Sequence, residues 1–399
     1  MAPMNNTLTD IPGLRVGHAA VPGPNALSGT TVVLAPPGGA VAAVEVRGGG
    51  PGTRETDALD PNNVVERIDA VVLTGGSAYG LDAASGVMAW LEEQGRGVRV
   101  GPEPHQVVPV VPAACVFDLG RGGDWRARPD AAVGRAAVEA AATEFAEGNA
   151  GAGTGAVVGG VKGGVGTASV RLASGVVVAA LVVVNAVGSA IDPGNGVLYG
   201  EYGEIEEYAE NAESGESKSG TGPMQLPPRA THLAAQERIR RARERMGLPP
   251  LNTTLAVVAT DARLTGSQAQ KLAGTAHDGL ARAIRPAHLM HDGDTIFALA
   301  TGSHTPAPPT TPSSTPSTTP SRAPSTTPST DASPSPSPSP NPSPSPTPAP
   351  APMPPEELNL ILAAGADVVA RAIVRGVRAA ESVEGAGGTF PSYRDLYGS

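Results

Sequence analysis

Asn252 and Thr253 are the two neighbouring residues of this chain with the most direct route to covalent chemistry. They follow Pro249 and Pro250 and precede a β-branched, apolar run that predicts a buried strand. Proline ends a helix and favours extended geometry in the residue before it. The pair therefore lies at a forced joint between a charged, helix-forming run (235–246) and that strand.

At such a joint the Thr253 hydroxyl can attack the carbonyl carbon of Asn252. An N→O acyl shift and hydrolysis then leave Thr253 as a new N-terminus, whose free α-amine can act as the base for its own hydroxyl. With an ordinary pKa of about 8, that amine is partly neutral at pH 7. The same residue types are also common in turns and strands, so the pattern alone leaves a purely structural role open.

Two carboxyl groups and one amide are the candidate partners of Thr253. Asp292 and Asp294 form an Asp-Gly-Asp turn before a second apolar strand, and Asn185 ends a third. A carboxylate could orient the Thr253 amine or hold the free amino group of a peptide, whereas solvated turns and half of a metal loop have the same composition. The Asn185 amide could donate to an oxyanion, or simply make a strand-end turn.

Two glycine-rich loops are candidates for substrate binding. In the first, a strand meets a helix through Gly-Gly-Ser, and the backbone N–H groups around Ser77 could face a carboxylate or an oxyanion. Close packing explains the same joint equally well. The second loop, over 148–155, contains Gly153 and Thr154, which we also assign to substrate binding.

Several motifs, in the same order along the chain, resemble the L-aminopeptidase/D-esterase and β-aminopeptidase family, the self-processing, N-terminal-nucleophile-like S58 peptidases. They are Thr-Asp-Ile-Pro-Gly-Leu-Arg-Val-Gly-His at 9–18, Val-Arg-Gly-Gly-Gly-Pro-Gly-Thr-Arg-Glu-Thr at 46–56, Leu-Thr-Gly-Gly-Ser-Ala-Tyr-Gly-Leu-Asp-Ala-Ala at 73–84, the glycine loop at 148–155, Val-Asn-Ala-Val-Gly at 184–188, Asn-Thr-Thr at 252–254 and Pro-Ser-Tyr at 391–393.

The resemblance implies a layered αββα sandwich of mixed β-sheets flanked by helices. It further implies an aminopeptidase that acts on small peptides, amino-acid amides or esters, with Thr253 as nucleophile and Asn185 at the oxyanion. In related enzymes the neighbourhood of Phe117 lines the substrate site and often offers an aromatic hydroxyl, so we assign Phe117 to substrate binding. Related enzymes have a pattern like Ser-Gly-Glu where this chain has Asp292-Gly293-Asp294. Self-cleavage would give chains 1–252 and 253–399, which are expected to assemble as a homo-oligomer.

Two other classes of protein remain open. The ornithine acetyltransferases also mature before a threonine and continue into a similar Val-Ala-Thr-Asp strand, so acyl transfer is the rival enzymatic reaction. A non-catalytic binding protein that stays uncleaved is the third reading.

Composition narrows the class of partner. The 28 basic and 38 acidic residues give a net charge of −10, which argues against a nucleic-acid or anionic membrane surface. The single cysteine, Cys115, excludes an internal disulfide framework, and no secretory signal or spanning helix is predicted, so we expect a cytoplasmic protein. The seven histidines are scattered and no metal-loop pattern occurs, so we expect neither a metal nor a cofactor.

Periodicity predicts the elements that position these residues. Apolar spacing predicts helices over 81–94, 131–146, 267–285 and 356–380, the third capped by Thr265 or Ser267. Residues 201–250 are expected to form a processing linker. We predict one hydrolase domain over 1–303 and 353–399, with a disordered Pro/Ser/Thr insertion at 304–352.

Overall fold

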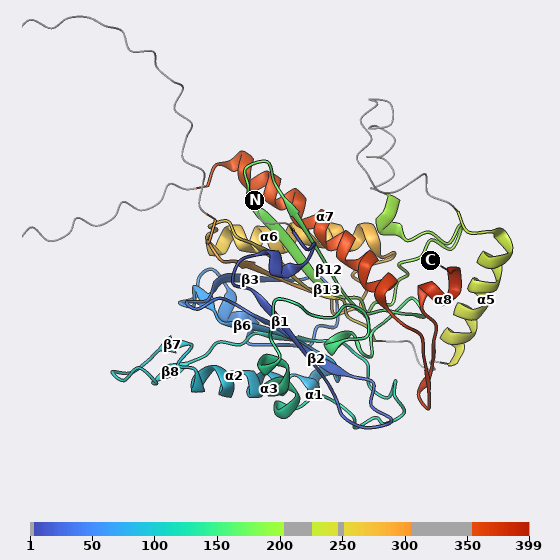
Figure 1. Cartoon of the computed structure of the whole chain (residues 1–399), viewed down its shortest axis with the longest axis horizontal. Coiled ribbons are helices and arrows are strands. Elements are labelled where there is room, and N and C mark those ends of the chain that lie inside the picture. The colour runs from blue at the N-terminus through green and yellow to red at the C-terminus, as the bar shows by residue number, and fades with distance from the viewer. Residues whose placement is uncertain (1–3, 203–225, 246–250, 305–352, 399) are drawn as a thin grey trace, which may run out of the picture.

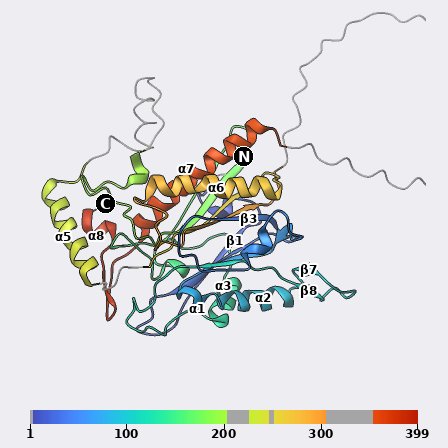
Figure 2. The ribbon, with the colours of Figure 1, turned by 180° about the vertical axis from the view of Figure 1, so that it is seen from behind.

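The computed structural model describes residues 4–202, 226–245, 251–304 and 353–398 (Figure 1). The predicted insertion at 304–352 therefore lies outside the described residues except for His304. The described chain forms two face-to-face sheets with a pair of helices on each outer side, as both views show (Figures 1 and 2).

One sheet has five strands and mixed directions. In spatial order its strands are β1 (Arg15–Ala20), β2 (Gly29–Leu34), β6 (Ala70–Thr74), β9 (Ala113–Cys115) and β4 (Thr53–Arg54). Only β6 and β9 are parallel. Helices α2 (Ala83–Glu93) and α3 (Ala131–Glu139) cover its outer face.

The second sheet has six strands and carries the candidate nucleophile. In spatial order its strands are β12 (Val165–Arg171), β13 (Val177–Val183), β14 (Leu255–Thr260), β15 (Thr295–Ala300), β3 (Ala40–Val46) and β5 (Arg67–Ile68). Helices α6 (Gly266–Ala283) and α7 (Pro355–Ala379) pack on its outer face and on one another.

Three hydrophobic clusters hold the four layers of helices and sheets together. Alternate residues of β13 face opposite ways: Val178, Ala180 and Val182 pack against α6 and α7, while Val177 and Leu181 pack against the five-stranded sheet. A strand that is buried on both faces reads as a continuous apolar run, which is why this stretch lacks polar alternation. The predicted αββα sandwich is confirmed.

The remaining elements are the helix α5 and a set of short helices and strand ribbons. They are η1 (Leu8–Asp10), η2 (Thr56–Leu59), α1 (Ser77–Gly80), the β7–β8 ribbon (Val98–Arg99, Val107–Val108), η3 (Gly151–Gly153), the β10–β11 ribbon (Val157–Val158, Val161–Lys162), η4 (Tyr199–Glu201), α5 (Arg229–Arg245), the β16–β17 ribbon (Val383–Gly385, Gly388–Phe390) and α8 (Tyr393–Tyr397).

The predicted helices exist, with some corrected boundaries. Thr265 caps α6 by accepting from the Gln268 N–H, as predicted. The helix predicted over 131–146 ends at Glu139, because Ala142 instead pairs with Val16 of β1 through two backbone hydrogen bonds. Part of the linker predicted over 201–250 is the helix α5, which packs against α8.

None of the helices in the described ranges combines the length and the apolar character that a membrane span needs.

Candidate active site

The candidate nucleophile and the Asp-Gly-Asp turn meet at the N-terminal ends of two central strands of the six-stranded sheet, β14 and β15. Strands β14 and β15 are parallel neighbours, with Leu255 opposite Thr295. The residues before each strand therefore lie side by side, and a further parallel bridge joins Asn252 to Asp292. The sequence separates the two segments by about forty residues, and the parallel register is what brings them together.

The Thr253 hydroxyl lies against the carbonyl of the preceding residue. Its Oγ1 donates to the carbonyl oxygen of Asn252 at 2.7 Å. The same oxygen accepts the backbone N–H of Gly293 at 3.1 Å. Both Asn252 and Thr253 are buried, so these hydrogen bonds polarise the carbonyl with little competition from water.

Gly293 is required by close approach to the nucleophile. A Cβ atom at this position would lie 2.6 Å from Thr253 Oγ1 and 2.7 Å from the carbonyl oxygen of Gly50. Real Cβ atoms do not approach other atoms this closely, so a side chain here would displace the hydroxyl. The glycine lets the turn bring its N–H to the Asn252 carbonyl.

Asp292 and Asp294 use their carboxylates to fix the backbone around Thr253. Asp294 accepts the Thr254 N–H at 2.8 Å, and its other oxygen accepts the N–H and Nδ1 of His288 at 3.1 and 2.8 Å. Asp292 accepts the N–H groups of Val187 and Leu289 at 3.1 and 3.0 Å. Burial, and then the neighbouring Asp294 carboxylate, raise the pKa of Asp292 above its ordinary value.

Asn185 is fully buried beside the same joint. Its Oδ1 accepts from Arg121 Nη1 at 2.6 Å and from the Val157 N–H at 3.0 Å. Among the described residues, its Nδ2 makes one long contact, 3.5 Å, to the carbonyl of Phe117. The backbone carbonyl of Asn185 accepts the Thr254 hydroxyl at 3.3 Å. The side-chain amide is thus held through its oxygen Oδ1, whereas its donor nitrogen Nδ2 makes a weak hydrogen bond.

Two buried basic side chains around this site, those of Arg121 and Lys162, were missed by the sequence analysis. Arg121 lies in the loop after β9 and donates to Asn252 Oδ1 at 2.7 Å as well as to Asn185. Lys162 ends β11 and donates from Nζ to the carbonyls of Gly153 and Gly163 at 2.9 and 2.6 Å. Burial, followed by the charge of Arg121, lowers the pKa of Lys162 to about 7.

Nothing in the sequence signalled that either residue is buried. Lys162 stands in a Gly-Gly-Val-Lys-Gly-Gly stretch, and Arg121 in Gly-Arg-Gly-Gly-Asp at 120–124. Both stretches have the glycine-rich composition of exposed turns, and lysine and arginine are mostly exposed in proteins.

The other predicted substrate-binding residues lie in the supporting loops. Ser77 begins α1, and the N–H before it, that of Gly76, donates to the buried Asp118 carboxylate at 2.7 Å. The carbonyls of Gly153 and Phe117 accept from Lys162 and Asn185, as described above. The Thr154 hydroxyl bonds back to Gly151 at 2.7 Å. The contacts of Gly153 and Phe117 support the network through backbone atoms, so substrate binding by this group stays a prediction.

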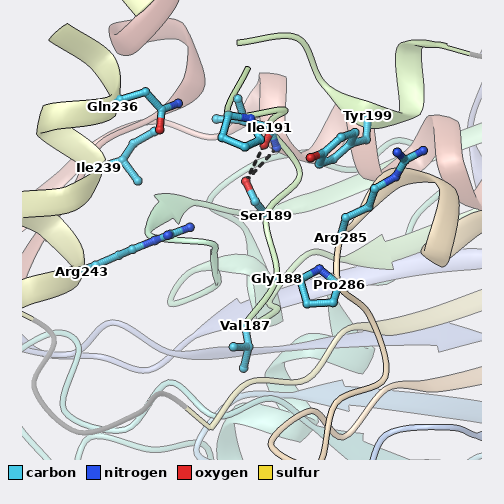
Figure 3. A pocket seen from close by; sticks show the side chains of 11 residues that line it. Val187, Gly188, Ser189, Ile191, Tyr199, Gln236, Ile239, Arg243, Arg285 and Pro286 are labelled. Atoms are coloured by element: carbon cyan, nitrogen blue, oxygen red, sulfur yellow. Dashed lines mark hydrogen bonds between the residues drawn. The ribbon is translucent and has the colours of Figure 1, made fainter. Parts of the chain in front are cut away.

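A cavity of about 250 Å³ lies next to this network (Figure 3). Val187 connects the two, since its N–H bonds Asp292 while the residue also lines the cavity. The wall carries polar groups from Ser189 and Tyr199 and two arginines, Arg243 of α5 and Arg285. Among the described residues no group of three or more His, Cys, Asp or Glu side chains is arranged to hold a metal ion.

Comparison with known proteins identifies the family, through a family model and through related sequences. The family model for peptidase family S58 matches residues 6–390. The chain is 42% identical over 404 residues to an uncharacterised aminopeptidase of Mycobacterium tuberculosis, covering 98% of each protein. It is 33% identical over 304 residues to the 6-aminohexanoate-oligomer endohydrolase of a Kocuria species, covering 73% of this chain and 74% of the relative.

Solved structures share the fold at low identity. A Burkholderia β-aminopeptidase superposes with a TM-score of 0.63 at 21% identity, covering 99% of this chain and 93% of the other. The L-aminopeptidase D-Ala-esterase/amidase of Ochrobactrum anthropi, described as a variant of the Ntn hydrolase fold, superposes with a TM-score of 0.62 at 20% identity, covering 98% and 92%. The chain therefore belongs to peptidase family S58, and it is a hydrolase of the peptidase type.

Proposed function

We propose that the chain is a self-processing aminopeptidase whose nucleophile is Thr253. The observation that carries the proposal is the 2.7 Å contact between Thr253 Oγ1 and the Asn252 carbonyl, which also accepts the Gly293 N–H. A hydroxyl, a peptide carbonyl and a backbone donor are thereby held together inside a buried joint. These are the parts that an intramolecular acyl shift needs.

The maturation step balances as follows. Thr253 Oγ1 attacks the Asn252 carbonyl carbon, the C–N bond breaks, and the departing amide nitrogen takes up the hydroxyl proton. The Gly293 N–H stabilises the oxygen that becomes negative in between. Water then hydrolyses the resulting ester, which gives Asn252 a carboxylate and restores the Thr253 hydroxyl beside the α-amine that the shift set free.

In the mature enzyme the same hydroxyl attacks the substrate. The α-amine of Thr253 takes the hydroxyl proton and passes it to the departing amine of the substrate, leaving an acyl-enzyme that water hydrolyses. We assign the oxyanion to the Gly293 N–H and the Asn185 amide, whose Nδ2 is weakly engaged. Asp294 holds the Thr254 N–H and Asp292 holds the adjacent turn, so both serve as positioning residues.

Intact mass and N-terminal sequencing of the purified protein test this proposal. Scaling the chain mass of 39.8 kDa by 252/399 and 147/399 gives fragments of about 25 and 15 kDa, the smaller beginning Thr-Thr-Leu-Ala. Thr253→Val should remain a single chain, and Thr253→Ser should still mature.

Thr260→Val is the matched control, because it removes a buried hydroxyl at the other end of β14, where it bonds the carbonyl of Val177. It should mature at a rate close to that of the wild-type protein. Active wild-type protein that stays a single chain, or a Thr253→Val variant that is still cut at this bond, would refute the mechanism.

A second candidate activity is cleavage inside linear amide oligomers, which the name of the Kocuria relative suggests for this chain. The exposure of Leu251 favours it, since this residue directly precedes Asn252 on the acyl side of the proposed bond and is open to solvent. Substrates with an acetylated N-terminus separate the two activities. An aminopeptidase does not cleave substrates with an acetylated N-terminus, whereas an endohydrolase does.

A further inference from the structure

The side chain of Asn252 has a dedicated partner in the structure. Arg121 Nη2 donates to Asn252 Oδ1 at 2.7 Å, while Nη1 donates to Asn185 Oδ1 at 2.6 Å and to the carbonyl of Gly155 at 2.7 Å. Acceptors from three separate segments therefore fix the guanidinium. Only one of them, Asn252, belongs to the bond that is to be cut.

The guanidinium is buried and charged. Arg121 is 9% exposed, and although burial lowers its pKa to about 10, against the opposing effect of Asp118, it remains protonated at neutral pH. A buried hydrogen-bond donor that loses its acceptor destabilises the protein, because the donor has given up its contacts with water and no protein contact replaces them. If Asn252 leaves after self-cleavage, Arg121 Nη2 needs another acceptor at the same place.

Asn252 is the acyl donor of the first reaction at Thr253, so its contacts map where a later acyl donor binds. Its carbonyl accepts the Gly293 N–H, its own N–H donates to the carbonyl of His291 at 3.1 Å, and its side chain meets Arg121. In an aminopeptidase substrate the free α-amine takes the position of the Asn252 nitrogen. The side chain of that first residue then faces Arg121.

We propose that Arg121 is a specificity-determining residue that selects substrates whose N-terminal residue carries an oxygen acceptor on its γ carbon, namely L-asparaginyl and L-aspartyl peptides and amides. This inference rests on the proposed function, because it requires Thr253 to be the nucleophile in both reactions. The structural reason is complementarity: the site is built to hydrogen-bond a side-chain carbonyl at the distance that Asn252 provides. A site of this kind discriminates strongly against an isosteric apolar group.

The test uses the processed wild-type protein and a pair of isosteric substrates, L-asparaginyl-p-nitroanilide and L-leucyl-p-nitroanilide, with the L-aspartyl compound as a third. The expected kcat/KM for the asparaginyl and aspartyl compounds exceeds that for the leucyl compound roughly tenfold to a hundredfold, the range of a hydrogen bond to a charged group. Arg121→Met should abolish this ratio by lowering the rate with the polar substrates. Arg126→Met, an exposed arginine of the same loop, is the matched control and should keep it.

Since Arg121 also bonds Asn185, the Arg121→Met variant can fail to mature. Two further measurements test the proposal without the Arg121→Met variant. The wild-type substrate ratio needs no variant, and in the precursor Asn252→Leu should slow self-cleavage while Asn252→Asp should preserve it.

The outcomes separate the two proposals. Thr253-dependent hydrolysis in which the leucyl compound reacts as fast as the asparaginyl one overturns the assignment of Arg121 and leaves the proposed function standing. A protein that neither cleaves itself nor hydrolyses any of the three compounds overturns both.

Discussion

The carboxylate of Asp294 accepts the backbone N–H of Thr254 at 2.8 Å, so a side chain from the β15 turn fixes the residue directly after the candidate nucleophile. Its second oxygen holds His288. Asp294 is almost fully buried, which makes these hydrogen bonds strong and their loss costly.

Asp294→Ala should therefore slow self-cleavage roughly tenfold or more, because removing a charged acceptor leaves buried N–H groups unpaired at about 1–3 kcal/mol each. The conversion of precursor into two chains, followed by gel electrophoresis over time, measures the effect. Asp278→Ala, at an exposed site of α6, is the control and should mature normally. Equal rates for the two variants would contradict the positioning role.

Gly293→Ala should block maturation while leaving the sandwich folded. The added Cβ would lie 2.6 Å from Thr253 Oγ1, so the hydroxyl or the turn has to move away from the Asn252 carbonyl. Gly50→Ala is the matched control. Gly50 lies in the loop that faces the same turn, and its added Cβ would meet the carbonyl oxygens of Met290 and Asp292 at the ordinary distances of 3.5 and 3.7 Å. Circular dichroism checks the fold of both variants, and intact mass reports whether they are cut.

Lys162 predicts a pH dependence of stability. Its pKa falls from 10.5 to about 7 on folding, so between these values the unfolded chain binds more protons than the folded one, and stability rises with pH. From pH 7 to pH 9 the gain amounts to about 2 kcal/mol, since one pH unit corresponds to about 1.4 kcal/mol per proton.

Lys162→Met should lose this rise, because it has no proton to release. Both proteins are best compared in the uncleaved Thr253→Val background, by urea unfolding at pH 7 and pH 9. Subtracting the two pH responses removes the contribution of other groups. Identical responses would show that Lys162 titrates normally.

Thr265 predicts a local stability effect that is independent of the site. Its hydroxyl accepts the Gln268 N–H at the start of α6, and the side-chain oxygen of Gln268 accepts the Thr265 N–H. Thr265→Ala should lower the free energy of unfolding by about 1 kcal/mol. Maturation should be unaffected, and a lost cleavage would mean that the α6 cap and the joint are coupled.

The sequence by itself determined the layers and the position of the candidate nucleophile. Continuous apolar strands, helical spacing in α6 and α7, and the proline joint before Asn252 are local patterns, and each has a local physical cause. The order of motifs indicated the family. The residue type, the preceding amide and the strand that follows made Thr253 a candidate, and the resemblance of the whole chain to the family made it the predicted nucleophile.

Tertiary structure decided what surrounds that residue. The parallel register of β14 and β15 brings the Gly293 N–H to the Asn252 carbonyl, and no local pattern records which strands become neighbours. The same holds for Arg121, which looks like an exposed turn residue until the loop after β9 folds over the joint. The order of residues along the chain sets the bond that is proposed to react, whereas long-range packing sets the hydrogen-bond donors and buried charges around it.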